Sequence, residues 1–382
     1  MKKFILLCTF CWGMLVPGAR ACTSFLAGRN ATIDGSTFIT YAADSHTLYG
    51  ALKFIPAARH PKNSTMEIRE WDTNKLLGHI PQVEYTYKVV GNMNEHQLSI
   101  TESTWGGRPE LVDTTGIIDY GSLMYIALQR AKTAREAITV MTDLVSEYGY
   151  YSSGESFSIA DPEEVWIMEM IGKGPQNQGA VWVAVRIPDD CIAAHANQSR
   201  IHKFPLDDKE NCLYSPDVIS FAREQGYFNG LNKDFSFADA YAPADFGALR
   251  GCEARVWSFY NRFNSSMGKY LSYLNGKSKE YLPLYIKPDK KLSVQDMKDA
   301  MRDHFEGTPF DMTQDVGAGP FKCPYRFRPM TFKVDSVEYT NERAVATQQT
   351  AFTLVAQMRS WLPNAIGGVL WFGVDDTNTC VY

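Results

Sequence analysis

The sequence predicts an α+β fold, because its strand and helix patterns occur in separate blocks along the chain. Short β-type runs at residues 22–28 and 36–42 come first, and the turn-prone residues 30–35 between them predict a hairpin. A helical block follows, and strand patterns then return without the regular alternation of strand and helix that a parallel sheet needs. We therefore expect helices to be layered against sheets.

The next part of the chain predicts a second hairpin and two helices. Residues 84–90 alternate between two faces, and residues 97–103 follow after a Gly-Asn turn. In residues 119–148 the apolar positions fall on one helical stripe, which predicts two helices with one buried side. Thr133 and Glu136 fit a capping box at the start of the second helix.

Strand patterns resume after these helices. Residues 180–187 alternate with a period of two, with valines and an isoleucine on one face. The other expected strands are residues 155–160, 164–171, 328–334, 350–358 and 366–374. The other expected helices lie near residues 214–226, 252–266 and 293–305.

Residues 1–21 have the composition of a signal peptide. Two lysines form a basic start, residues 4–16 are apolar, and Ala19 and Ala21 give the small-x-small pattern of a cleavage site. We expect export to the periplasm or the extracellular space, with residues 22–382 forming one domain. The chain ends soon after a predicted core strand, so we also expect that domain to be incomplete at its C-terminus.

Composition and charge exclude several classes of function. The chain is 45% hydrophobic, which is ample for a core, and no run after residue 21 approaches the roughly 20 apolar residues of a membrane span. A formal net charge of −5 without clustered Lys and Arg argues against a nucleic-acid surface. The 7 histidines are scattered and no zinc-binding motif follows residue 21, so we expect no metal and no cofactor.

Cleavage after residue 21 would make Cys22 the first residue of the mature chain. A thiol attacks as its thiolate, so a cysteine with the usual pKa of about 8.5 needs a base or a cation beside it. The new α-amine, with a pKa of about 7.7–8.0, can take the thiol proton and later protonate the leaving nitrogen. Among the other cysteines, we expect Cys212 to pair with Cys252, since exported proteins permit disulfides.

The position of Cys22 alone leaves other interpretations open. A cysteine just after a signal peptide also fits a lipid-attachment site, half of a disulfide or a small buried residue. Ala19 and Arg20 depart from the usual residues of a lipid-attachment motif, which argues against the first of these.

Several blocks of sequence resemble one known family. The run CTSFLAGRNATIDGSTFITYAADSH at residues 22–46 is similar to the mature start of the cysteine dipeptidases of the N-terminal-nucleophile superfamily, which are relatives of secernins, penicillin V acylases and conjugated bile acid hydrolases. Similar blocks follow at residues 87–104, 117–138, 150–174, 194–201, 252–264 and 366–376. The resemblance implies a four-layer αββα sandwich of two antiparallel sheets flanked by helices, with the nucleophile at the mouth of a cleft between the sheets.

The resemblance also implies catalytic roles. Cys22 matches the nucleophile, Asp44 the aspartate that holds its amine, and Asn197 the asparagine that donates to the oxyanion. Many relatives carry an arginine just before the aspartate, where this chain has Tyr-Ala-Ala at residues 41–43. Arg255, which matches a later arginine of the family, is therefore the candidate for stabilising the thiolate. From the residues alone, Asp44 also fits a turn cap and Arg255 an ion pair on a helix surface.

The resemblance places another polar contact near Glu102 and Thr104. A dipeptidase must also bind a free α-ammonium and, usually, a free α-carboxylate. Glu102 or Asp113 offers a negative charge for the former. Arg108 or Arg200 offers a positive charge for the latter. All of these charged residues also fit an ordinary solvated surface.

The sequence therefore predicts a secreted enzyme that hydrolyses dipeptides through an acyl-thioester on Cys22. Its expected partner is a small peptide substrate, and a homo-oligomer is left open. One alternative is the same machinery acting on N-acyl amino acids, penicillin or bile-acid conjugates. An alternative of another class is a binding protein anchored through a lipid on Cys22.

Overall fold

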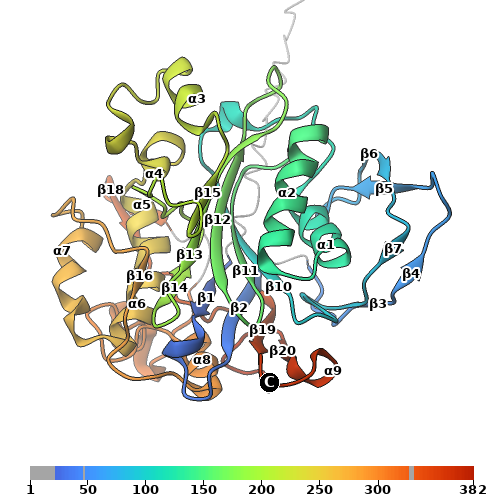
Figure 1. Cartoon of the computed structure of the whole chain (residues 1–382). Helices are drawn as coiled ribbons and strands as arrows, with labels where there is room; N and C mark the ends of the chain where they lie inside the picture. The colour runs from blue at the N-terminus through green and yellow to red at the C-terminus, as the bar shows by residue number, and fades with distance from the viewer. Residues whose placement is uncertain (1–21, 46–47, 327–330) are drawn as a thin grey trace, which may run out of the picture.

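Two sheets lie face to face between two layers of helices in the computed structural model, which describes residues 22–45, 48–326 and 331–382 (Figure 1). The six-stranded sheet has the order β16-β14-β1-β2-β19-β20. In that order its strands are Tyr285–Ile286, Ile192–His195, Ser24–Ala27, Thr37–Asp44, Thr350–Met358 and Val369–Val374. The first described residues thus enter the middle of this sheet, at β1.

The second sheet has eight strands in the order β15-β13-β12-β11-β10-β9-β8-β3. In that order they are Cys212–Tyr214, Ala180–Ile187, Val165–Gly172, Gly154–Ala160, Ser99–Trp105, Met93–Asn94, Val89–Val90 and Phe54–Ile55. Neighbouring strands pair antiparallel throughout both sheets. The predicted α+β class with antiparallel sheets flanked by helices is confirmed.

Helices cover the outer face of each sheet. The eight-stranded sheet carries α1 (Tyr120–Arg130) and α2 (Ala134–Tyr148), and the six-stranded sheet carries α6 (Ala254–Phe263) and α8 (Val294–Met301) (Figure 1). The remaining short helices are α3 (Val218–Glu224), α4 (Phe237–Tyr241), α5 (Phe246–Ala248), α7 (Leu271–Leu274) and α9 (Asn364–Gly367). Three two-stranded sheets are formed by β4 (Ala58–Arg59) with β7 (Tyr85–Thr86), β5 (Thr65–Arg69) with β6 (Leu76–Pro81), and β17 (Thr331–Val334) with β18 (Val337–Thr340).

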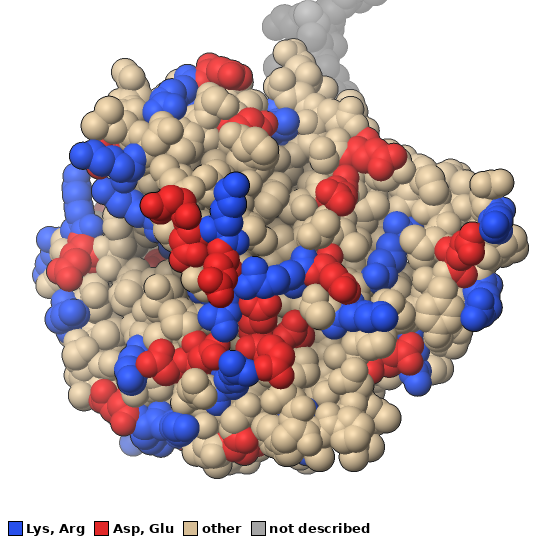
Figure 2. Space-filling view, viewed as in Figure 1, with Lys and Arg blue, Asp and Glu red and all other residues tan. Residues whose placement is uncertain are grey.

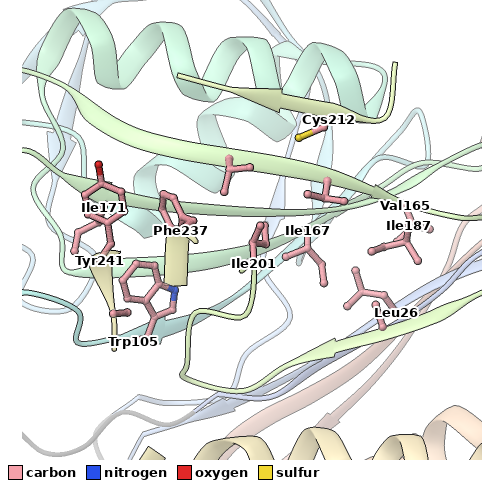
Figure 3. Close-up of a cluster of buried hydrophobic side chains, with 14 of the residues drawn as sticks. Leu26, Trp105, Val165, Ile167, Ile171, Ile187, Ile201, Cys212, Phe237 and Tyr241 are labelled. Atoms are coloured by element: carbon pink, nitrogen blue, oxygen red, sulfur yellow. The ribbon is translucent and has the colours of Figure 1, made fainter. Parts of the chain in front are cut away.

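Three apolar clusters hold the four layers together. The central cluster fills the space between the sheets, where Leu26 of β1 faces Ile167 of β12 and Trp105 closes one end (Figure 3). The alternation along β1 explains how one strand serves two layers, because Leu26 points to this cluster and Phe25 to the cluster under α6. Phe25 stacks on Phe259 of α6 with ring centroids 4.1 Å apart. Burial on both faces fixes the position of β1 and of Cys22 and Thr23 directly before it.

Local sequence signals explain where several elements begin. Thr133 caps α2 by accepting a hydrogen bond from the backbone of Glu136 at 3.2 Å. The predicted capping box is completed differently, because the carboxylate of Glu136 accepts from the backbone of Lys132 instead of that of Thr133. The predicted second hairpin contains an extra strand, β9, since the side chain of Asn94 accepts from His96 and Leu98 and creates a second turn.

One further expectation was a disulfide between Cys212 and Cys252. The expected disulfide is wrong, because Cys212 lies buried on β15 and both it and Cys252 are free thiols.

Figure 2 shows acidic and basic side chains interspersed over one face of the molecule. Within the described ranges, no helix combines the length and the apolar character needed to cross a bilayer.

Candidate active site

Cys22 lies at the point where the two central strands of the six-stranded sheet meet. Thr23 and Ala42 exchange backbone hydrogen bonds of 3.2 and 2.9 Å, which place Cys22 beside the end of β2. Its side chain points toward the eight-stranded sheet, where Oε1 of Glu102 on β10 lies 3.5 Å from the sulfur. The nucleophile expected from the sequence is therefore buried between the sheets, with 6% of its surface exposed.

The nitrogen of Cys22 has a dedicated acceptor. It donates to Oδ1 of Asn197 at 2.8 Å, and Asn197 follows β14, which pairs with β1. The side-chain nitrogen of Asn197 donates to the carbonyl oxygen of Thr104 at 2.5 Å, and its backbone nitrogen donates to Ser103 at 3.2 Å. These contacts, together with a φ of 57°, fix the Asn197 oxygen on the amine position and not on the thiol.

Arg255 of α6 binds the backbone around the nucleophile. Its guanidinium donates to the carbonyl oxygen of Cys22 and to the hydroxyl of Thr23, both at 2.7 Å, and to Oδ1 of Asn197 at 2.9 Å. Burial, together with the charge of Arg343, lowers the pKa of Arg255 to about 10, so it remains a cation at neutral pH. The sequence assigned Arg255 to the thiolate, but its guanidinium contacts backbone oxygens, Thr23 and Asn197, which indicates a positioning role.

Asp44, at the end of β2, faces a cation that the sequence did not indicate. Its carboxylate forms an ion pair with Arg343 and accepts from the hydroxyl of Thr350 at 2.5 Å. The expected hold on the amine of Cys22 is instead made by Asn197, while the backbone N–H of Asp44 hydrogen-bonds the sulfur. Burial raises the pKa of Asp44, and Arg343 and Thr350 oppose that shift. Arg343 thus supplies the guanidinium beside Asp44 that residues 41–43 lack.

The thiol of Cys22 is surrounded by acidic groups. Its sulfur lies 3.5 Å from Oε1 of Glu102 and 3.9 Å from the hydroxyl of Tyr41, and Tyr41 also donates to Glu102. Burial raises the pKa of Cys22 well above its ordinary value, and the charges of Glu102 and Asp44 raise it further. The thiol is therefore held in its protonated form until another group removes the proton.

A second carboxyl, Glu155 on β11, lies beside Glu102. Oε1 of Glu155 and Oε2 of Glu102 are buried and have no other hydrogen-bond partner among the described residues, and the two side chains hydrogen-bond each other. Such a bond needs one proton between the two carboxyls. Burial raises the pKa of Glu155 strongly, with the charge of Glu102 as the next cause, so the pair carries one proton and one charge. The hydroxyl of Thr104 donates to Glu155 at 3.0 Å.

A narrow pocket leads to the thiol. Its volume is about 30 Å³, which is room for about two water molecules. It is lined by Cys22, Tyr41, Ala43, Asp44, Ser45, Leu48, Trp71, Asp72, Glu102, Thr104 and Tyr120. Four residues expected at the site, namely Cys22, Asp44, Glu102 and Thr104, are brought together here. No Lys or Arg of the described chain lines this pocket.

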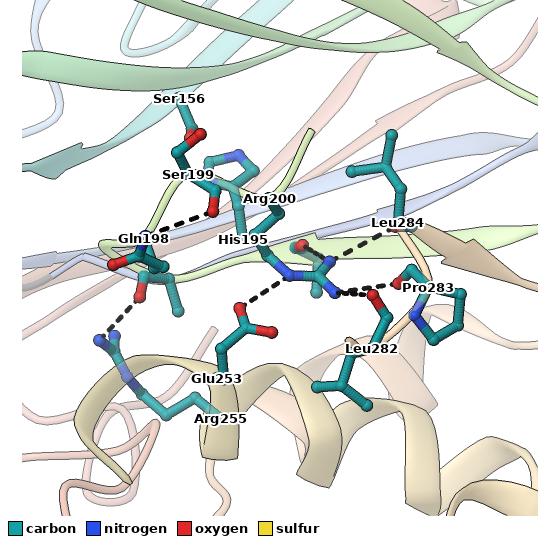
Figure 4. A network of polar contacts seen from close by, with 12 residues as sticks. Ser156, His195, Gln198, Ser199, Arg200, Glu253, Arg255, Leu282, Pro283 and Leu284 are labelled. Carbon is teal, nitrogen blue, oxygen red and sulfur yellow. Dashed lines mark hydrogen bonds and ion pairs between the residues drawn. The ribbon is translucent and has the colours of Figure 1, made fainter. Parts of the chain in front are cut away.

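Arg200 is placed away from the pocket, in contrast to its expected role. Its guanidinium pairs with Glu253 at 2.9 Å and donates to the carbonyl oxygens of Ala194 at 2.8 Å and Pro283 at 2.9 Å (Figure 4). It is 2% exposed, so a substrate carboxylate cannot reach it. Arg200 joins the loop after β14 to the segment before β16, which is a structural role.

Arg108 and Asp113 also lie outside the pocket. Arg108 donates to the carbonyl oxygen of Ala240 at 2.6 Å, and its guanidinium lies 3.8 Å from the ring centroid of Tyr227. Asp113 accepts from the backbone and the hydroxyl of Thr115 at 2.8 and 2.6 Å, which makes it a turn residue. Of the two carboxylates considered for a substrate ammonium, only Glu102 is at the nucleophile.

His195 of β14 supports the Asn197 loop without acting on the thiol. Its ring nitrogens bond the hydroxyls of Ser103 at 2.6 Å and Ser158 at 2.7 Å, both on the eight-stranded sheet. Burial, followed by the charges of Arg200 and Arg255, lowers the pKa of His195 to about 3. The ring is therefore neutral at physiological pH and joins the two sheets next to Asn197.

Comparison with known proteins connects this site to one family. A model of peptidase family C69 matches residues 21–382. The chain belongs to peptidase family C69. It is thus a peptidase, and the resemblance indicated by the sequence blocks is confirmed.

Relatives of this C69 peptidase carry dipeptidase names. A "Probable dipeptidase" of Salmonella dublin is 26% identical over 404 residues, covering 100% of this chain and 84% of the relative. A "Probable dipeptidase" of Latilactobacillus sakei is 27% identical, covering 94% of this chain and 72% of the relative. "Dipeptidase A" of Lactobacillus helveticus is 24% identical, covering 94% of this chain and 74% of the relative.

The ion pair between Arg343 and Asp44 makes a testable contribution to the stability of this C69 peptidase. Arg343→Met leaves the buried carboxylate of Asp44 without its cation, and breaking a buried pair in this way typically costs about 3–5 kcal/mol. Unfolding in urea should show this loss. The double variant with Asp44→Asn should recover most of it, because no uncompensated charge remains. A loss below about 1 kcal/mol in the single variant would contradict the pairing.

Proposed function

We propose that this chain is an exported dipeptidase in which Cys22, freed by removal of residues 1–21, is nucleophile and its α-amine is the general base. The observation that carries the proposal is the hydrogen bond of 2.8 Å from the Cys22 nitrogen to Asn197, with the thiol on the same residue facing the pocket. The family match begins at residue 21, next to Cys22, which supports residues 22–382 as one domain.

Removal of the leader changes the chemistry of the nitrogen. While residue 21 is attached, the nitrogen of Cys22 is an amide whose lone pair is delocalised into the carbonyl, so it cannot accept a proton. Cleavage converts it into an amine with a pKa of about 7.7–8.0 before environmental shifts. Oδ1 of Asn197 then accepts a hydrogen bond from the amine and orients its lone pair. Arg255, bonded to both Cys22 and Asn197, holds this arrangement.

The reaction has two steps, acylation of Cys22 and hydrolysis of the thioester, and both use the thiol and the α-amine of Cys22. The thiol proton of Cys22 passes to the α-amine as the sulfur bonds the scissile carbonyl carbon, and the carbonyl oxygen becomes negative. The C–N bond then breaks as the α-ammonium protonates the leaving amine, which leaves a thioester. Water attacks the thioester with the α-amine as base, the C–S bond breaks, and the thiol regains its proton.

Two donors are available for the negative oxygen. The backbone N–H of Asp44 hydrogen-bonds the sulfur of Cys22, so it is one candidate donor to an oxygen on the carbon that the sulfur attacks. The side-chain nitrogen of Asn197 uses one hydrogen on Thr104, and its second hydrogen is the donor that the family resemblance assigns to the oxyanion. Arg343 contributes by holding the carboxylate of Asp44 and thereby the end of β2.

The acidic pocket favours a peptide with a free amine. Glu102 and Asp72 line it, so a protonated α-amine meets negative charge, whereas an N-acyl amino acid or a bile-acid conjugate brings no cation. The names of the C69 relatives support dipeptides as the substrate class. In the structure the pocket is closed around the nucleophile, so we propose that side chains at its mouth move when a dipeptide enters.

Substrate profiling of the processed enzyme tests this proposal. Release of amino acids from alanyl dipeptides should exceed release from their N-acetylated forms by about 100-fold or more in kcat/KM, since an unpaired buried charge is left when the ammonium is absent. Penicillin V and a glycine-conjugated bile acid serve as the comparison substrates. Turnover of these acyl amides without cleavage of dipeptides would overturn the dipeptidase assignment. An intact mass showing a lipid on Cys22 would support the anchored binding protein instead.

A further inference from the structure

The thiol of Cys22 lies among anions, which is an unusual environment for a cysteine nucleophile. Reactive cysteines are normally activated by a nearby cation. Here the two closest guanidinium groups are committed elsewhere: Arg255 binds the carbonyl oxygen of Cys22, and Arg343 binds the carboxylate of Asp44. Glu102 lies 3.5 Å from the sulfur. The enzyme at rest therefore disfavours the thiolate that the reaction requires.

The carboxyl pair of Glu102 and Glu155 is built to hold one negative charge at this place. Glu102 is 1% exposed and Glu155 is 0% exposed, and they sit on the neighbouring strands β10 and β11. Burial raises the pKa of Glu155, so the shared proton belongs to Oε1 of Glu155 and is donated to Oε2 of Glu102, which keeps its charge and directs Oε1 at the sulfur and at Tyr41. Oε1 is free to accept a new donor as soon as the thiol stops donating to it.

A dipeptide carries a suitable cation at a fixed distance from the atom that is attacked. Its α-ammonium nitrogen lies two bonds from the scissile carbonyl carbon, which is about 2.5 Å. When that carbon approaches the sulfur of Cys22, the ammonium comes within hydrogen-bond reach of a carboxylate oxygen that is itself 3.5 Å from the sulfur. The geometry thus places the substrate charge between Glu102 and the thiol.

We propose that the α-ammonium of the bound substrate, docked on the Glu102–Glu155 pair, is the cation that switches Cys22 from thiol to thiolate. This inference rests on the proposed dipeptidase function. On docking, the ammonium replaces the S–H donor on Oε1 of Glu102 and neutralises its charge. The thiol proton then moves to the α-amine of Cys22. Substrates without an ammonium would therefore fail at activation as well as at binding.

The other groups around the thiol are consistent with this switch. Asp44 on β2 is paired with Arg343, so its charge is already balanced. Tyr41 donates to Glu102, and burial, then Cys22 and Glu102, raise its pKa, so it stays a neutral donor. The α-amine is held by Asn197 on the other side of the residue. Among the nearby charges, Glu102 raises the pKa of Cys22 the most, although burial contributes more than any charge. Neutralising Glu102 should therefore lower the pKa of the thiol more than neutralising any other charged group.

Alkylation of Cys22 by iodoacetamide, measured beside dipeptide turnover on the processed enzyme, separates this role from a structural one. Glu102→Gln removes the charge, so alkylation at pH 7 should become faster by about threefold for each unit by which the thiol pKa falls, because lower nucleophilicity offsets part of the gain in thiolate. Turnover of dipeptides should fall by about 100-fold in the same variant, because the ammonium loses its partner. Loss of folding would also expose the buried thiol and speed its alkylation, so the rates are compared only for variants whose unfolding transition in urea matches that of the parent.

Two further variants keep the test decisive. Glu102→Asp retracts the carboxylate by one methylene. Its alkylation rate should be higher than that of the parent and its turnover lower, with both values between those of the parent and Glu102→Gln. Glu110→Gln removes an exposed carboxylate that bonds Tyr227 far from the thiol, and both of its rates should stay within about twofold of the parent. Glu155→Gln, which keeps a donor toward Glu102, should retain at least about tenfold more turnover than Glu155→Ala.

The possible outcomes distinguish this inference from the function on which it rests. Faster alkylation with slower turnover in Glu102→Gln supports the switch. Unchanged or slower alkylation in that variant overturns the switch, while dipeptide cleavage by the parent would still stand. A parent enzyme that cleaves no dipeptide fails the proposed function directly, and the alkylation rates remain readable because they need no substrate.

Discussion

Cys22→Ala, produced to begin at residue 22, should lose at least about 10⁴-fold in kcat, because removal of the nucleophile from enzymes with covalent intermediates costs up to about 10⁶-fold. Cys22→Ser should be less active than the parent but more active than Cys22→Ala, because a hydroxyl is a poorer nucleophile than a thiol although the α-amine can still act as its base. The thiol is a small part of the core, so the free energy of unfolding should change by about 1 kcal/mol or less.

Rates of dipeptide hydrolysis and urea unfolding of the same samples check this expectation. Cys380→Ala is the matched control, because Cys380 is a free thiol near the other end of the chain and its removal should leave kcat within about twofold. If Cys22→Ala kept more than about one hundredth of the parent kcat, the acyl-thioester would be excluded.

The second large effect is expected at Asn197. Asn197→Ala removes the acceptor of the Cys22 nitrogen and one partner of Arg255, so the base is no longer oriented and kcat should fall by about 100-fold. Asn197→Asp keeps an oxygen in place but adds a negative charge beside the α-amine. That charge favours the protonated amine and raises its pKa, so the acid limb of the pH–rate profile should move to higher pH.

The pH dependence of kcat/KM between about pH 5 and pH 9 measures this shift. Asn177→Asp, which adds the same charge on an exposed loop, is the control and should leave the profile in place. A profile of Asn197→Asp that moves to lower pH, or Asn197→Ala with nearly full activity, would show that Asn197 does not hold the catalytic amine.

Much of the framework follows from local sequence. The turn at residues 30–35 and the alternation of residues 180–187 predict strands that the structure contains, and the stripe in residues 119–148 predicts α1 and α2. These signals are local, because a strand or helix period depends on residues a few positions apart. The order of strands is not local: β1 pairs with β14 and β2 with β19, and the four-layer arrangement was available only through the family resemblance.

The site shows the same division between local and long-range information. Cys22 was found from its place after a cleavage signal, and Glu102 from its block of sequence. Arg343 reaches Asp44 across 299 positions from a segment without any motif, so no pattern indicated it. Glu155 was missed because its proximity to Glu102 depends on the register of β10 with β11, which the sequence does not give.

Arg200 was assigned wrongly for a related reason. Its sequence neighbours resemble a functional block, but its partners are Glu253 and backbone carbonyl oxygens before β16, which only the folded chain brings together. A buried arginine with carbonyl partners cannot be told from a substrate-binding arginine by sequence, since both are single cations whose burial and partners are set by the fold.

The identity of the N-terminal residue in the active enzyme tests the central claim most directly. The processed enzyme should begin with Cys22 carrying a free amine, which N-terminal sequencing and intact mass both report. A chain that keeps one additional residue before Cys22 should retain the thiol but lose dipeptide turnover, because its nitrogen is an amide without basicity. Full activity in a chain that still carries residue 21, or that carries a blocked amine on Cys22, would contradict the mechanism.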